Sequence, residues 1–153
     1  MTEPTLSKLL MQGTFLYKKI MTRIVEPHGL TFTQYQALKV ICDQPGLSAK
    51  EMLDILDTDK ATLSGVITRL EERHLIERRA NRDDRRLRII EATSYSHRMI
   101  ETIETKQREI EESLFTGMRN KDRKFLLDRL KQVLKNQHST LIHLKFNKEE
   151  TLK

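Results

Sequence analysis

The chain has 153 residues, 37% of them hydrophobic and 33% charged, and its formal net charge is +6. That length suits one domain with a buried core, and the basic balance favours a polyanionic partner such as nucleic acid. A lone cysteine excludes a disulfide framework, no apolar run is long enough to span a membrane, and Met1 to Leu10 lack a secretory cleavage signal, so we expect a cytoplasmic protein.

The first predicted element is a helix from about Leu6 to Glu26, in which apolar residues recur at mostly helical spacing. Pro27 and Gly29 end it. Its apolar stripe is longer than one small lobe can cover. We therefore expect part of this helix to pack against a second subunit.

Two capping-box patterns mark the next two helices. Thr31 with Gln34 predicts one helix start, and Ser48 with Glu51 predicts the other, because each pair can satisfy free amide groups at a helix N-terminus. The second of these helices is short and ends near Leu56.

A fourth helix follows, with either Thr58 or Asp59 as its N-cap. Two short helices separated by a few residues form a helix-turn-helix, whose second helix reads DNA. Short hydroxyl side chains and cations suit contact with base edges and phosphates. The polar face of the fourth helix supplies the candidate DNA-binding residues Lys60, Thr62, Ser64, Gly65, Thr68 and Arg69.

The segment after the fourth helix predicts a hairpin, with strands at Glu77–Arg79 and Arg85–Glu91 around the polar turn Ala80–Asp84. Residues 78–88 hold six arginines and two aspartates. Arginine reaches phosphates and enters narrow minor grooves, and an aspartate can pair with one arginine and direct another. The alternative is a solvated hairpin tip with local ion pairs. The candidate DNA-binding residues here are Arg82, Asp84, Arg85 and Arg86.

Two long helices are predicted to complete the chain, from about Thr93 to Met118 and from about Lys121 to Leu144. Their apolar stripes again exceed what one small lobe can bury, which favours a shared dimer core. The polar tail that follows is predicted to be flexible.

Several short motifs are shared with a known family. They are Leu30-Thr31 with Gln34, Leu63-Ser64 with Arg69-Leu70-Glu71, Leu75-Ile76 with Arg78, and, most specifically, Asp84-Arg85-Arg86 followed by Thr93. In these features the chain resembles the multiple-antibiotic-resistance regulator (MarR) family. Three positions depart from the family pattern. His74 and Ser96 stand where glycine is frequent, and Ala92 stands where leucine usually precedes the threonine.

The resemblance implies a mainly helical fold with a small β-wing, in which a winged helix-turn-helix is flanked by N- and C-terminal dimerisation helices. We divide the chain into residues 1–29, 30–92 and 93–146, with a tail at 147–153. It implies a homodimeric regulator of transcription that binds near-palindromic double-stranded DNA, most often a repressor. A small aromatic or phenolic effector would release the DNA, with the candidate lining residues Phe15, Tyr17, Met21, Phe32 and Tyr35.

The residues also allow other interpretations. Cys42 could be a redox sensor, but a sensor needs a stabilised thiolate and only Lys39 is basic nearby, which favours an inert thiol. The five histidines form no ligand set for a metal, and no catalytic or cofactor motif is present, so we expect neither an enzyme nor a cofactor. A protein-binding adaptor or antirepressor of the same fold is the remaining alternative.

Overall fold

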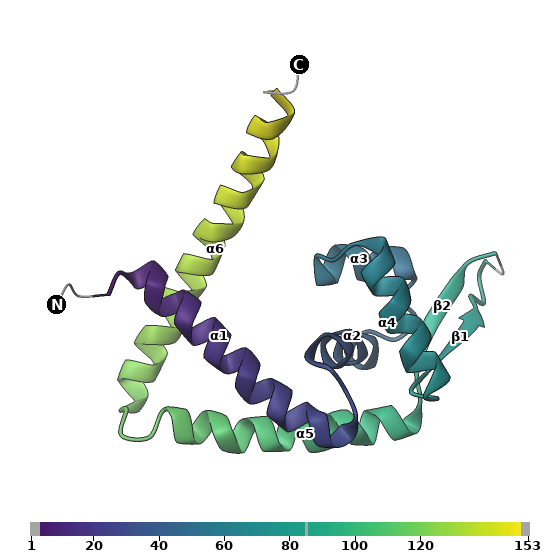
Figure 1. Cartoon of the computed structure of the whole chain (residues 1–153), viewed down its shortest axis with the longest axis horizontal. Coiled ribbons are helices and arrows are strands. Elements are labelled where there is room, and N and C mark those ends of the chain that lie inside the picture. Colours follow the sequence, from purple (N-terminus) through teal and green to yellow (C-terminus); the bar gives the residue numbers. More distant parts are fainter. Residues whose placement is uncertain (1–3, 85, 151–153) are drawn as a thin grey trace. The chain divides into compact units, whose positions relative to one another are not determined.

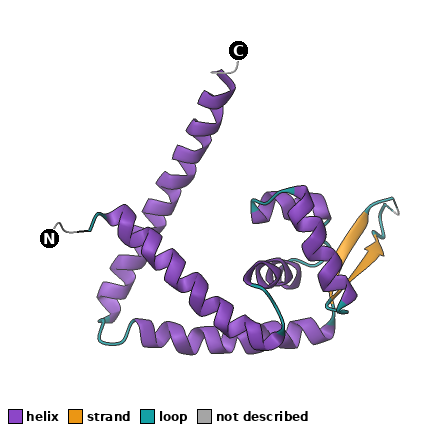
Figure 2. Cartoon of the chain, viewed as in Figure 1, coloured by secondary structure: helices purple, strands orange, loops and turns teal. Residues whose placement is uncertain are grey.

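The computed structural model describes residues 4–84 and 86–150, with residues 140–150 as backbone alone. Helices dominate the described residues, and two strands form an antiparallel hairpin (Figure 1; Figure 2). The chain forms two compact units, Met1–Glu109 and Ile110–Lys153, which divide within α5. The elements are α1 Leu6–Val25, η1 Glu26–His28, α2 Phe32–Asp43, α3 Ala49–Leu56, α4 Lys60–Glu72, β1 Ile76–Ala80, β2 Arg88–Ala92, α5 Ser94–Leu114 and α6 Asn120–Glu150.

Both predicted capping boxes are confirmed. Gln34 Oε1 accepts from the Thr31 amide at 2.9 Å, and Thr31 Oγ1 accepts from the Gln34 amide at 3.1 Å. Glu51 Oε2 accepts from the Ser48 amide at 2.8 Å, and Ser48 Oγ accepts in return at 3.3 Å. Each cap stabilises its helix by about 1 kcal/mol, so the starts of α2 and α3 are set locally.

The end of α4 explains how the chain turns into the wing. His74 has a φ of 54°, and the amides of His74 and Leu75 donate back to the carbonyls of Glu71 and Leu70. This is a Schellman arrangement, which normally favours glycine at the position of His74. The buried Ser96 hydroxyl then donates to the Leu75 carbonyl at 2.6 Å, which ties the start of α5 to the start of β1.

The core of the first unit lies around α2, which contacts α1, α3, α4 and β2. Side chains from all of these elements are fully or almost fully buried, among them Met21, Leu38, Ile41, Met52, Leu70 and Ile90. Figure 1 shows α3 and α4 beside the hairpin in this unit. Because five elements contribute these core side chains, this unit has the packing of a domain that can hold its own shape.

The wing hairpin pairs Ile76 with Ala92 at its base and Ala80 with Arg88 at its outer end. We predicted that the second strand starts at Arg85, which is wrong, because β2 begins at Arg88. Side chains of the turn accept from backbone amides two residues ahead, which keeps the segment in turns instead of a ladder. At the base of the wing, the Ile90 amide donates to the Leu47 carbonyl and joins the wing to the helix-turn-helix.

The second unit consists of the end of α5, a turn with Gly117 at a φ of 82°, and α6. The fifth helix stops at Leu114, earlier than predicted, because the chain reverses around this left-handed glycine. The last helix continues to Glu150, beyond the predicted end at Leu144, since no proline or glycine interrupts it. No residue between 110 and 139 is buried by the rest of the described chain.

None of the helices in the described ranges combines the length and apolar character needed to cross a membrane.

Candidate nucleic-acid interface

The fourth helix separates an inner apolar face from an outer polar one. Leu63, Ile67 and Leu70 are buried against the lobe, whereas Lys60, Thr62, Ser64, Thr68 and Arg69 are exposed. A Cβ built on Gly65 would meet nothing within 4 Å, so a crossing helix does not account for this glycine within the described chain. The exposed face of α4 is therefore open at Gly65.

The hydroxyl groups of α4 do not donate to carbonyl groups of their own helix, unlike several hydroxyl groups of other helices. Thr14, Thr22 and Thr102, for example, donate to the carbonyl four residues earlier. Within the described residues, the side chains of Ser64 and Thr68 make no hydrogen bond, and the hydroxyl of Thr62 donates to Asp59 Oδ2 at 2.6 Å. The polar atoms of this face are thus available to a partner outside the chain.

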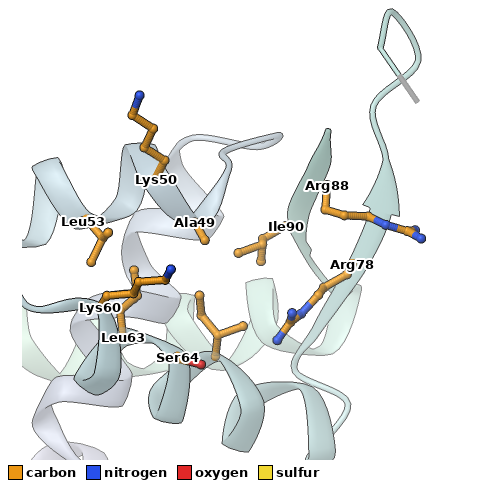
Figure 3. Close-up of a pocket in the computed structure, with 10 residues that line it drawn as sticks. Ala49, Lys50, Leu53, Lys60, Leu63, Ser64, Arg78, Arg88 and Ile90 are labelled. Carbon is orange, nitrogen blue, oxygen red and sulfur yellow. The ribbon is translucent and has the colours of Figure 1, made fainter. Parts of the chain in front are cut away.

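A groove of about 410 Å³ lies between α3, α4 and the wing (Figure 3). Its floor is apolar and its rim is basic. In Figure 3, Arg78 reaches from β1 toward α4, whereas Arg88 points outward from β2. The lining residues are Ala49, Lys50, Leu53, Lys60, Leu63, Ser64, Ile67, Arg78, Arg88 and Ile90.

The groove adds basic residues that we did not select from the sequence. Lys50 lies on α3, and Arg78 and Arg88 lie on the two strands of the wing. Arg78 is held by Glu71, whose Oε2 lies 3.0 Å from Arg78 Nε. The clustering of arginines was visible in the sequence, but Lys50 gave no local signal because only folding brings α3 beside the wing.

The side chains of Asn81 and Asp84 hold the wing loop in its turns through hydrogen bonds to the backbone. Asp84 Oδ1 accepts from the backbone amide of Arg86 at 2.9 Å, and Asn81 Oδ1 accepts from that of Asp83 at 2.8 Å. We predicted that Asp84 directs a neighbouring arginine by pairing with it. In the described residues it holds the backbone of Arg86 instead.

The arginines of the hairpin fall into two groups. Arg79 pairs with Glu77 and Glu91, at 2.8 Å and 3.3 Å, so the local ion-pair interpretation describes the strand well. Arg82 and Arg86, in contrast, form no ion pair with any described residue and are exposed at the tip. Arg85 lies outside the described residues. Among the described arginines of the hairpin, Arg82, Arg86 and Arg88 form no ion pair with a described residue and are left for a polyanion.

The candidate effector residues lie at a junction of α1, α2 and α5. Tyr35 donates to Gln107 Oε1 at 3.2 Å, and Gln107 Nε2 donates to the Tyr17 hydroxyl at 2.6 Å. Phe32 stacks on Tyr35 with 6.4 Å between ring centroids. Of the two remaining candidates, Met21 belongs to the core and Phe15 is exposed on α1. None of the five lines the groove beside the wing.

A charged cluster stands next to this junction. Lys39 Nζ lies 2.7 Å from Glu104 Oε1 and also pairs with Asp43. Burial alone would lower the pKa of Lys39, but hydrogen bonds with Asp43 and Glu104 outweigh it and raise the pKa. Burial, followed by the charge of Glu104, raises the pKa of Tyr35. Lys39 and Tyr35 therefore both stay protonated at neutral pH.

Cys42 is half-buried on α2. Burial, together with the charge of Asp43, raises the pKa of its thiol from the ordinary 9.0 to about 11. Since the thiolate is the reactive form, the raised pKa lowers the reactivity of this thiol at neutral pH. Among the described residues, no three histidine, cysteine, aspartate or glutamate side chains gather into a metal site.

Alkylation of Cys42 by iodoacetamide at neutral pH should be roughly a hundredfold slower than that of an ordinary thiol, because the raised pKa reduces the thiolate fraction. The rate should climb as the pH approaches 11. Mass spectrometry of timed samples measures it, with a free cysteine peptide as the control. Fast alkylation near neutrality, or loss of DNA binding after mild peroxide, would restore the redox-sensor interpretation.

Comparison with known proteins gives matches over most of the chain. Residues 28–87 match the family model described as MarR family. The chain is 28% identical over 112 residues to the uncharacterized HTH-type transcriptional regulator YwoH of Bacillus subtilis, across 73% of this chain and 81% of that protein.

Two solved structures are similar as well. The crystal structure of MarR matches with a TM-score of 0.76 at 24% identity, across 92% of this chain and 95% of that one. The structure of the S. aureus MepR–DNA complex matches with a TM-score of 0.74 at 21% identity, across 87% and 96%. The predicted fold class, a mainly helical winged helix-turn-helix with a two-stranded wing, is confirmed.

Proposed function

The chain belongs to the MarR family of DNA-binding transcription regulators, and from this premise we propose that it is a homodimeric repressor of near-palindromic operators. The observation that carries the proposal is the exposed polar face of α4, flanked by the basic rim of the groove and by the unpaired arginines of the wing tip. The structure of a relative of this fold in complex with DNA supports it.

We assign the contacts by reach and charge. The N-terminal half of α4, with Lys60, Thr62 and Ser64, enters the major groove, as in other helix-turn-helix proteins. Thr68 and Arg69, farther along the same face, contact the edge of the groove or the phosphates, and Gly65 allows the backbone a close approach. Arg82, Arg85 and Arg86 of the wing reach the flanking minor groove, whose negative potential favours the weakly hydrated guanidinium.

The homodimer follows from apolar surface that the chain leaves uncovered. On α6, Phe125 is 62% exposed, Leu127 51% and Leu134 63%, and residues 110–139 include no buried one. Helices with such a stripe are not stable in water alone, since burial of each large apolar side chain contributes about 1.5–3 kcal/mol. A second copy of the chain is the partner that a two-fold operator requires.

Release by a small aromatic or phenolic effector is the second half of the proposal. The family resemblance implies it, and the junction of Tyr17, Tyr35 and Gln107 supports a place for it. A phenol could replace one tyrosine hydroxyl as the partner of Gln107 and lie beside Phe32. Because this junction joins α1, α2 and α5, its rearrangement would act on the spacing of the two recognition helices.

Selection from random duplex DNA should return a near-palindrome with half-sites about 10 bp apart, set by the two-fold axis and the helical repeat. Affinity should fall steeply with salt, because the basic contacts release condensed counterions. Fluorescence anisotropy at several salt concentrations measures this, with a scrambled duplex as the control. Recovery of no preferred sequence would favour the protein-binding adaptor instead.

A further inference from the structure

We propose that Asp59 fixes the Thr62 hydroxyl as a hydrogen-bond acceptor toward DNA, so that Thr62 selects a base pair presenting an exocyclic amino group. The inference deepens the proposed function and rests on it, since it takes α4 to be the reading helix. Thr62 is then a specificity-determining residue, and Asp59 is a positioning residue that acts through it.

The single hydrogen of the Thr62 hydroxyl is already donated to Asp59. Asp59 Oδ1 accepts from the Thr62 amide at 2.8 Å, and Asp59 Oδ2 accepts from the Thr62 hydroxyl at 2.6 Å. An ionised carboxylate can only accept, so the hydroxyl must be the donor. The hydrogen bonds from the Thr62 side chain and amide hold the pKa of Asp59 below its usual value, which keeps the carboxylate ionised at neutral pH.

The remaining lone pairs of Thr62 Oγ1 accept no hydrogen bond from the described chain. Thr62 is exposed on the first turn of α4, and no group of the described chain donates to its hydroxyl. A hydroxyl that could rotate freely would accept from a donor or donate to an acceptor on a base edge. With its hydrogen held by Asp59, this one offers lone pairs only.

The major groove contains two kinds of group that such an oxygen can distinguish. Adenine N6 and cytosine N4 are donors, whereas guanine O6 and thymine O4 are acceptors. An acceptor facing an acceptor leaves both unsatisfied, which is costly in a desolvated interface. The base that Thr62 contacts should therefore be adenine or cytosine, preferred about tenfold over thymine or guanine.

Asp59→Asn reverses the polarity of this arrangement while keeping the cap. Asparagine is as good an N-cap as aspartate, and its Oδ1 must stay with the Thr62 amide. Its amino group then takes the place of Oδ2 and donates to Thr62 Oγ1. The hydroxyl hydrogen is released toward the DNA, and the preference at that base should shift toward thymine or guanine.

The experiment compares base preferences of the full-length chain and its variants by selection from random duplex DNA. Thr62→Ser should keep the amino preference, Thr62→Val should erase it at one position per half-site, and Asp59→Asn should invert it. Asp57→Asn is the matched control, since it removes the same charge two residues earlier, at a φ of 46° that asparagine tolerates. Both Asp→Asn variants should gain overall affinity, but the control should keep its base preference.

Two results would overturn the assignment. One is an unchanged preference in Thr62→Val, which would mean that another side chain reads that base. The other is a base preference of Asp59→Asn identical to that of Asp57→Asn, which would mean that Asp59 affects binding only through its negative charge. The absence of any preferred sequence for the unmodified chain is a different outcome, because it contradicts the proposed function itself.

Discussion

Replacing Leu127 and Leu134 by aspartate is expected to abolish dimers and, with them, high-affinity operator binding. The two side chains are 51% and 63% exposed in the single chain and lie seven residues apart on one face of α6. If a partner subunit covers them, their loss removes about 3–6 kcal/mol of interface free energy, which is a hundredfold or greater rise in the dimer dissociation constant.

If the two subunits shared a single core through α6, charged residues on this helix, at Leu130 and Leu134 for example, would destroy the dimer and the fold together. The first unit, however, has a core of its own that includes Leu38, Met52 and Leu70. Helical signal from that unit should therefore survive in the monomer, although the second unit loses order.

Analytical ultracentrifugation across a concentration series measures the dissociation constant, and circular dichroism follows the remaining helix. Gln132→Asp is the matched control, since it introduces the same charge at an exposed polar position of α6 and should leave the dimer intact. A well-folded monomer formed by the unmodified chain would contradict the proposed homodimer directly.

Arg86→Ala in the wing is expected to weaken operator binding by about ten- to a hundredfold without changing the dimer or its melting temperature. The side chain is exposed, forms no ion pair with a described residue, and sits at a tip that contributes little packing. Arg86→Lys should restore only part of the loss, because an ammonium keeps the charge but lacks the planar, weakly hydrated guanidinium.

Asp84→Ala should weaken binding as well, even though it removes a negative charge from a DNA-binding loop. Its carboxylate holds the backbone amide of Arg86 at 2.9 Å, so its loss frees the loop that aims the arginine. Asp84→Asn keeps an acceptor in the same place and should retain most of the affinity. Electrophoretic mobility shift titrations on a selected operator compare these variants.

Arg79→Ala is the control for the wing, because Arg79 already pairs with Glu77 and Glu91 and its loss should have a small effect. If Asp84→Ala gained affinity, the wing would act as a diffuse basic patch and the orienting role would be wrong. If Arg79→Ala and Arg86→Ala lost affinity equally, position on the wing would not matter and only net charge would.

Most helix boundaries and the order of the elements could be predicted from the sequence, because the interactions that set them are local. A capping box joins residues three apart, so Thr31 with Gln34 and Ser48 with Glu51 predicted the starts of α2 and α3 correctly. Glycines and prolines likewise mark ends through their own backbone preferences. The helix-turn-helix followed by a wing, and hence the fold class, could be predicted from such signals in chain order.

Only the tertiary structure decided which polar groups remain for a partner. Arg79 and Arg86 look alike in the sequence, but the register of the hairpin places Glu91 beside Arg79 and leaves Arg86 at the tip. Lys50 joins the basic rim only because α3 packs near β2. The physical reason is that these pairings depend on contacts between residues far apart in the chain, which no local pattern encodes.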